Sequence, residues 1–245
     1  MLALVHTSPA HVPVFDALRD AHHPGLELRH FVDEELLSRA RADGPDAVAD
    51  DVRAVLRRAV SGGARAVLCT CSTLGGVAEA AAAGAGVPVL RVDRPAAAAA
   101  VAAGPRVVVL ATVRSTLAPT VALVEEEARR AGRPVEVRTR LVAGAWDRFE
   151  AGDTEGCARL VAATADAVAG ADAIVLAQAS MAPAERLTRT VVPVLSSPRP
   201  GLAAGAAAAA RGRSGPVLPP RGPAPGAPAR RAGGPARGPR PPAGE

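Results

Sequence analysis

The sequence predicts an α/β fold of two similar halves, and two observations carry that prediction. Between residues 2 and 200, short apolar runs alternate with longer segments of helical spacing, as in parallel sheets joined by crossover helices. Three landmarks also recur in the same order, and coding bias alone does not produce such an order. They are VHTSPAHVPV with LATVRSTLAPT, GARAVLCTCS with GADAIVLAQAS (aligned with one extra residue), and 87–90 before Arg94-Pro95 with 192–195 before Arg199-Pro200. Two such halves facing each other place a ligand cleft between them.

In the first half, residues typical of turns and helix ends bound each apolar run. Strands are expected at 2–5, 26–31, 66–69 and 87–92, and helices from near Pro13, over 46–60 and from Arg94 onward. The helix over 46–60 follows from valine and leucine at helical spacing, and Gly62-Gly63 ends it. The next helix has Pro95 in its first turn, where proline is favoured, and it stops at Gly104-Pro105.

The second half repeats this pattern of strands and helices. Strands are expected at 106–110, 135–141, 170–177 and 191–195, and helices at 119–131 and 154–168. A last helix over 201–210 stays open, because Gly205 interrupts the alanine-rich segment and glycine lowers helix stability.

These elements divide the chain into three expected parts. Residues 1–96 form a first α/β lobe, which 200–210 would complete, and 97–199 form a second. The tail 211–245 holds ten prolines and eight glycines, so we expect it to be disordered, since it cannot bury a core.

The positive net charge belongs to the tail rather than to the body of the protein. The tail has seven arginines and one acid, so its net charge is +6. Because the net charge of the whole chain is +5, residues 1–210 carry a net charge of −1. The tail could bind nucleic acid or anionic membrane, but a functionless extension is favoured, and the body has no basic stripe with aromatics. We therefore expect no nucleic-acid partner. No secretory signal or membrane span is apparent, so a cytoplasmic, membrane-free protein is expected.

The turn after the strand at 66–69 is the main candidate for chemistry. Cys69 lies inside the strand, where we interpret it as a core residue, while Cys71 lies at the strand's carboxyl end among hydroxyl side chains. Ligands of α/β sheets bind at that end of the strands, and the helix start after the turn favours negative charge. Cys71 could also be a small core residue, as most unpaired cysteines are, but its position favours a function.

Other polar and aromatic residues give weaker signals. His6 ends the first strand, and the roles of acid or base and of structural histidine are equally weighted. Cys157 is expected to pack in a helix, and Trp146 and Phe149 either border the cleft or pack against the core. No spacing of ligand residues predicts a metal site.

Taken together, these residues resemble the aspartate/glutamate racemase superfamily, which includes amino-acid and hydantoin racemases, maleate isomerase and arylmalonate decarboxylase. The resemblance rests on His6-Thr7, Cys71-Ser72-Thr73 (Cys-Asn-Thr in the family), Thr112 with Ser115-Thr116, and Gln178-Ala179-Ser180. It implies two flavodoxin-like three-layer domains related by a pseudo-twofold axis, with the ligand cleft between them. It also implies catalysis without a cofactor, and a homodimer is common in the family.

The resemblance further implies which residues act. Cys71 matches the first of the two family thiols, but Ala179 stands where we align the second, and His6 replaces an aspartate found in some racemases. We therefore expect a racemase-type isomerase that acts on a small amino acid or dicarboxylate through one thiol, with Cys71 and His6 as catalytic candidates. The alternatives are a member that binds a carboxylate without turnover and a single-thiol decarboxylase. The expected substrate-binding residues are Thr7, Ser8, Ser72, Thr73, Thr112, Ser115, Thr116, Gln178, Ala179 and Ser180.

Overall fold

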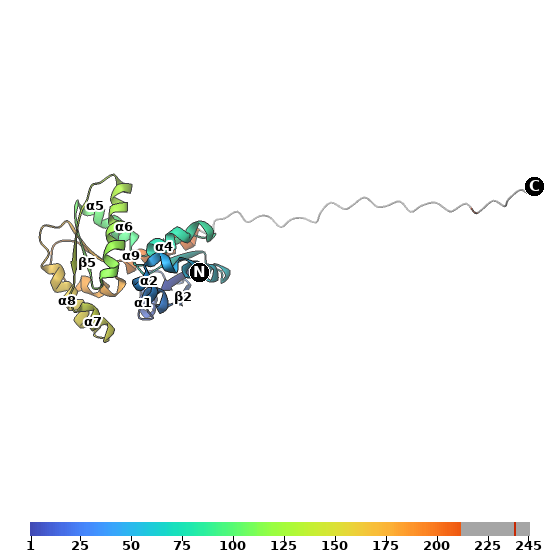
Figure 1. Ribbon diagram of the computed structural model, residues 1–245, viewed down its shortest axis with the longest axis horizontal. Helices are drawn as coiled ribbons and strands as arrows, with labels where there is room; N and C mark the ends of the chain where they lie inside the picture. The colour runs from blue at the N-terminus through green and yellow to red at the C-terminus, as the bar shows by residue number, and fades with distance from the viewer. Residues whose placement is uncertain (212–237, 239–245) are drawn as a thin grey trace, which may run out of the picture. The chain divides into compact units, whose positions relative to one another are not determined.

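A computed structural model describes residues 1–211 and 238, and these residues form two four-stranded parallel sheets (Figure 1). The first sheet has the order β2-β1-β3-β4 and the second has the order β6-β5-β7-β8. The strands are β1 (Leu2–His6), β2 (Leu28–Val32), β3 (Ala66–Cys69), β4 (Val89–Arg91), β5 (Arg106–Ala111), β6 (Glu136–Leu141), β7 (Ala173–Leu176) and β8 (Val194–Leu195). The shared order is that of flavodoxin-like sheets and confirms the predicted α/β fold of two similar halves.

Helices follow or precede the strands in both halves. Those before β5 are α1 (His11–His22), α2 (Glu34–Asp43), η1 (Pro45–Val48), α3 (Ala49–Ser61), α4 (Gly75–Ala80), η2 (Ala81–Gly84) and α5 (Arg94–Ala103). Those after β5 are η3 (Arg114–Thr116), α6 (Leu117–Ala131), α7 (Ala145–Glu150), α8 (Thr154–Asp166), η4 (Ala179–Arg186) and α9 (Pro198–Arg211). The helices α2 and α7 have no counterpart among the sequence-based expectations. α2 buries only Leu36 and Ala40, and α7 has six residues, so neither gives a strong apolar period.

Both faces of each sheet are covered, which explains why the inner strands β1, β3, β5 and β7 read as continuous apolar runs. The edge strands β2 and β6 also carry charged residues. In the first sheet, Ala3 and Val5 pack with residues of α2, α3 and α4, while Leu2 and Leu4 pack with Phe15 of α1 and with α9. In the second sheet, alternate residues of β5 and β7 pack on α8 or on α5 and α6. Cys69 and Cys157 lie in these cores, as predicted. The lobe boundaries near 96 and 199 stay a prediction, and the predicted disordered tail lies outside the described residues except for Arg211 and Gly238.

The two sheets share one hydrogen-bond register, and this corrects the alignment of the repeat. The amide of Thr70 donates to Val5 O, and the amide of Ala177 donates in the same way to Leu110 O. Thr70 therefore corresponds to Ala177, and Cys71 to Gln178. The extra residue that we placed in GADAIVLAQAS is wrong, because β3 and β7 have the same length. Gln178, rather than Ala179, occupies the position that matches Cys71.

The glycines of α9 bring this helix close to the first sheet. A Cβ on Gly201 would lie 2.4 Å from the carbonyl oxygen of Val92, and one on Gly205 would lie 2.9 Å from Leu2 Cδ2. The helix continues through Gly205 to Arg211, so this glycine permits close packing and does not end the helix.

We expect Gly201→Ala to lower the free energy of unfolding by about 1–3 kcal/mol, because the new methyl group meets a backbone carbonyl that cannot move alone. Gly84→Ala is the matched control, since a Cβ there has nothing within 4 Å. Urea unfolding of the full chain measures both changes. An equal, small effect at the two positions would contradict the close approach of α9.

Within the described residues, no helix combines the length and the apolar character needed to cross a membrane.

Candidate active site

A cavity of about 620 Å³ lies between the two halves, at the carboxyl ends of their strands. The first half contributes the loop after β1, the turn after β3 and the start of α2, and the second contributes α7 and the segment after β7. The lining residues are Thr7, Ser8, Pro9, Ala10, His11, Glu34, Leu37, Ser38, Arg41, Thr70, Cys71, Ser72, Thr73, Thr116, Trp146, Phe149, Glu150, Gly152, Thr154, Gln178, Ala179 and Ser180. The cavity lining thus contains nine of the twelve predicted site residues, of which Ala179 adds only a methyl group. His6, Thr112 and Ser115 are not part of the lining.

Cys71 lies in the turn after β3, with its side chain in the cavity wall and 8% of its surface exposed. The thiol of Cys69 donates a hydrogen bond to the carbonyl of Cys71 over 3.6 Å, from inside the strand. Burial is the main reason why the pKa of Cys69 is raised well above its ordinary value. Cys69 therefore stays protonated and supports the turn, while Cys71 is the thiol available to a ligand.

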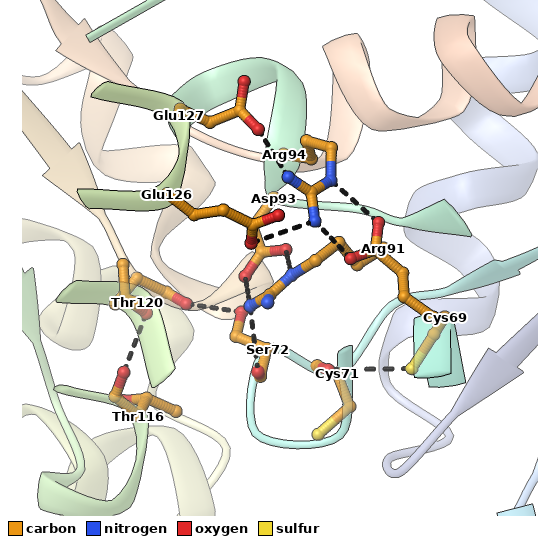
Figure 2. A network of polar contacts seen from close by, with 12 residues as sticks. Cys69, Cys71, Ser72, Arg91, Asp93, Arg94, Thr116, Thr120, Glu126 and Glu127 are labelled. Carbon is orange, nitrogen blue, oxygen red and sulfur yellow. Dashed lines mark hydrogen bonds and ion pairs between the residues drawn. The ribbon is translucent and has the colours of Figure 1, made fainter. Parts of the chain in front are cut away.

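A buried ion pair, Arg91 with Asp93, lies against the turn of Cys71 (Figure 2). The Arg91 guanidinium donates two hydrogen bonds to the Asp93 carboxylate, at 2.7 and 2.9 Å, and one to the carbonyl of Ser72 at 3.4 Å. Burial alone lowers the pKa of Arg91, but its hydrogen bond and attraction to Asp93 outweigh this effect and raise it. Gly75 leaves the space, because a Cβ there would lie 2.8 Å from Arg91 Nε. Arg91 can thus lie directly against the turn.

Ser72 links the two halves beside the cavity. Its hydroxyl donates a 2.7 Å hydrogen bond to the carbonyl of Ala177, which follows β7. A serine hydroxyl has a single proton, so Ser72 offers a ligand an acceptor rather than the donor that a carboxylate needs. Thr116 is committed in the same way, since its hydroxyl donates to Val113 O at 2.7 Å. The predicted role of both hydroxyls as donors to substrate is therefore not available in this arrangement.

A second contact between the halves is ionic. Arg94, at the start of α5, pairs with Glu79 of α4 and with Glu126 and Glu127 of α6 (Figure 2). These contacts raise the pKa of Arg94, chiefly through its hydrogen bond to Glu79. The cluster ties α4 to α6 and so helps to fix the two walls of the cavity.

Gln178 presents an oriented amide donor to the cavity. Its Oε1 accepts hydrogen bonds from the Thr112 amide at 2.7 Å and from the Thr112 hydroxyl at 3.0 Å. A backbone N–H can only donate, so the oxygen must face Thr112 and the amide cannot be flipped. The Nε2 group has no hydrogen-bond partner among residues 1–211 and 238. Thr112, which does not line the cavity, therefore acts on a ligand only by orienting Gln178.

Several hydroxyl groups of the cavity wall have uncommitted protons. Thr7, Thr73 and Ser180 line the cavity and donate no hydrogen bond within the part of the chain that the structure describes, and Thr73 Oγ1 is buried. Ser8 accepts a 3.3 Å hydrogen bond from the amide of Ala10 and keeps its own proton. Ser115 Oγ is likewise buried, with no partner in the described part of the chain, but it lies outside the cavity lining. Together with Gln178, these groups can bind an anion.

His6 faces the interior rather than the cavity. One ring nitrogen lies 2.8 Å from Thr70 Oγ1 and the other 2.8 Å from His30 Nδ1, whose own ring reaches Asp16 at 3.3 Å. Because the Thr70 hydroxyl donates to Val5 O, it must accept from His6 Nδ1. Burial, with smaller contributions from the nearby His11 and His30, lowers the pKa of His6 to about 3. Both nitrogens are thus committed to a neutral, structural ring.

This pKa makes the folded state sensitive to acid. Since the pKa of His6 in the folded protein is about 3 against an ordinary 6.5, the unfolded chain gains a proton that the folded one cannot hold. The stability that neutral His6 contributes is complete above pH 6.5 and is lost as the pH falls from 6.5 toward 3. We expect His6→Gln to reduce the fall in free energy of unfolding between pH 7 and 5 by about 2 kcal/mol. Urea unfolding at both pH values measures it, with exposed His22→Gln as control; identical slopes for His6→Gln and wild type would contradict it.

His11 is a cavity residue that the sequence-based prediction missed. It is the first residue of α1, its side chain lines the cavity, and its Nδ1 is buried without a hydrogen-bond partner in the described residues. Burial lowers its pKa. The signal that could have found it is its position five residues after the end of β1, at the same sheet edge as Cys71.

The outer rim of the cavity comes from the two helices that lacked a sequence signal. Arg41 of α2 lies over the ring of Trp146 of α7, with its guanidinium carbon 5.1 Å from the ring centroid. Phe149 packs beside Trp146, with the ring centroids 5.4 Å apart. The two aromatic residues therefore border the cleft, which was one of the two roles considered for them. Within residues 1–211 and 238, no three His, Cys, Asp or Glu side chains are grouped so that they could hold a metal ion.

Comparison with known families identifies this arrangement. A sequence model of the Asp/Glu/hydantoin racemase family matches residues 7–208, which include every strand after β1 and the whole cavity lining. The chain belongs to the Asp/Glu/hydantoin racemase family. The predicted superfamily is thereby confirmed, and a comparison with curated proteins gave no match.

Solved structures of this family's fold are similar to the chain at low sequence identity. Aspartate racemase from Picrophilus torridus has a TM-score of 0.64 and 15% identity, over 85% of this chain and 94% of that one. Allantoin racemase from Klebsiella pneumoniae has a TM-score of 0.60 and 20% identity, over 86% and 88%. Arylmalonate decarboxylase has a TM-score of 0.55 and 22% identity, over 85% and 92%. These likenesses establish the fold that the family members share.

Proposed function

We propose that this member of the Asp/Glu/hydantoin racemase family is a cofactor-independent, racemase-type isomerase that uses Cys71 on a small amino acid or dicarboxylate. One observation carries the proposal: the thiol of Cys71 lines a cavity between the halves that is rich in uncommitted hydroxyl and amide donors. A thiol is an effective base or nucleophile once it is ionised, and the donors suit an anionic ligand.

The chemistry requires charge stabilisation more than anything else. Removal of an α-proton beside a carboxylate leaves an enolate-like anion, which fixed N–H and O–H donors can stabilise in a site that excludes water. The amide of Gln178 is oriented for this by Thr112, and the hydroxyls of Thr73 and Ser180 have free protons. In this proposal Thr7 and Ser8 bind the substrate carboxylate, while Ser72 and Thr116 hold the walls in place.

A single-thiol decarboxylase is the second candidate function, and the residue in the second half that corresponds to Cys71 supports it. Gln178 is an amide there, so two thiols cannot act in turn. A single thiol suits a decarboxylase, and arylmalonate decarboxylase shares the fold. A member that only binds a carboxylate is the remaining alternative. The cytoplasmic location, the homodimer and the lack of a nucleic-acid or membrane partner stay predictions.

Hydrogen exchange in heavy water distinguishes these functions. We would incubate the full chain with both enantiomers of aspartate and glutamate, and with allantoin, maleate and phenylmalonate, and follow each by NMR. An isomerase exchanges the α-hydrogen or converts one isomer into another, and a decarboxylase releases carbon dioxide from phenylmalonate. A thermal shift with none of these reactions would leave the binding function and overturn the proposed isomerase.

A further inference from the structure

Inversion at the substrate carbon needs a group besides Cys71, because the proton that leaves one face must be replaced on the other. The corresponding position in the second half holds Gln178, whose amide does not exchange a proton with a substrate near neutral pH. The inference that follows rests on the proposed function, since it concerns the second proton carrier of the same site.

Five ionisable side chains line the cavity, and three of them lie at its exposed rim. Glu34, Arg41 and Glu150 are exposed, and an arginine does not release its proton in proteins. Cys71 and His11 are the more enclosed pair. The ring of His11 packs 6.2 Å from that of His6, centroid to centroid, and His6 in turn contacts Thr70, the residue before Cys71.

The environment of His11 differs from that of a structural histidine. His6, five residues earlier at the end of β1, has partners for both ring nitrogens. His11 has a buried Nδ1 without a partner among the described residues, and such an unsatisfied atom lowers the stability of the folded state. A ring held at this cost on a cavity wall has a nitrogen to offer a ligand.

The charge state of His11 also suits proton transfer. Burial lowers its pKa, so the ring is neutral at pH 7 and can accept a proton. Its place at the first position of α1 acts in the same direction, because the positive end of a helix disfavours an imidazolium.

We propose that His11 is the second proton-transferring residue of the cavity and acts with Cys71 on the same substrate carbon. The neutral imidazole takes the α-proton, and the electron pair of the broken C–H bond stays on the substrate as an enolate. The Cys71 thiol then gives its proton to that carbon, which leaves a thiolate and an imidazolium. Water carries the proton from the imidazolium back to the thiolate, so the protein returns to its starting state with no net change.

Exchange kinetics on whichever acid of the heavy-water panel reacts provide the test. We expect His11→Ala to lower kcat for α-hydrogen exchange by about 100-fold or more, with a much smaller change in KM. Added imidazole restores part of the rate of His11→Ala, which it could not do for a residue that only supports the fold. His22→Gln, an exposed histidine on the same helix, keeps the wild-type rate.

A histidine NMR spectrum of the full chain keeps the inference testable even if no acid reacts. The ring signals of His11, assigned from His11→Gln, are expected to be those of a neutral imidazole at pH 7 and to shift when iodoacetamide alkylates Cys71. Exchange that depends on Cys71 but is unchanged in His11→Ala would overturn the inference and leave the proposed function standing. If no acid reacts, the proposed function fails. If the His11 ring signals do not shift when Cys71 is alkylated, the inference is overturned separately.

Discussion

Replacing Cys71 with serine is expected to lower α-hydrogen exchange by about 10³-fold or more, while the protein stays folded. A serine hydroxyl is far less acidic than a thiol, so near neutral pH it is a poorer proton donor to an enolate, and it neither ionises to a base nor attacks a double bond. The two side chains differ by one atom, and Cys71 lies where the buried core of the first half meets the cavity wall. Exchange in heavy water measures the rate, and circular dichroism measures the fold.

Cys157→Ala is the control for this prediction. Cys157 is buried in α8, in the core of the second half and away from the cavity lining, so its loss removes packing but no chemistry. We expect the exchange rate of this variant to stay within about twofold of wild type. A Cys71→Ser variant that exchanges as fast as Cys157→Ala would remove the thiol from the mechanism.

The second large effect is expected from Asp93→Asn, which should lower the free energy of unfolding by about 3–5 kcal/mol. The substitution leaves the Arg91 charge buried without its carboxylate, and the side chain of Arg91 is only 6% exposed. It also loosens the turn of Cys71, because Arg91 holds the carbonyl of Ser72 only while Asp93 orients the guanidinium. Urea unfolding gives the energy.

The double variant Arg91→Leu with Asp93→Leu separates the pair from the packing around it. Replacing both charges with apolar side chains removes the unpaired charge, so its loss of stability should be smaller than that of Asp93→Asn. If the double variant were less stable than Asp93→Asn, the unpaired charge of Arg91 would not be the cause of the stability that Asp93→Asn loses. A loss below about 1 kcal/mol in Asp93→Asn would also contradict the account.

Apolar patterning predicted most of this fold, because both sheets are covered on both faces and the strands β1, β3, β5 and β7 are almost entirely apolar. The same covering placed Cys69 in the core and Cys71 at the strand end. The prediction failed where local sequence carries little periodicity, as in the polar helix α2 and the short helix α7, which supply Arg41 and Trp146 to the rim. Asp33 was an available signal, since its side chain accepts a hydrogen bond from the Leu36 amide at the start of α2.

Residue type alone could not predict which polar groups of the site are free. Ser72, Thr116 and Thr73 are similar in sequence context, but the first two donate to backbone carbonyls and only Thr73 keeps its proton for a ligand. His6 and His11 differ in the same way. Such assignments depend on contacts between segments far apart in the chain, among them the contact between Ser72 and Ala177, and sequence spacing does not contain them.

Alkylation of the native protein tests the role of Cys71 most directly. Iodoacetamide is added to the full chain, and mass spectrometry of the sites modified is compared over time with the rate of α-hydrogen exchange. We predict modification of Cys71 ahead of Cys69 and Cys157, loss of exchange in proportion to it, and slower modification in the presence of the acid that reacts. Full exchange activity in protein whose Cys71 is completely alkylated would contradict the account.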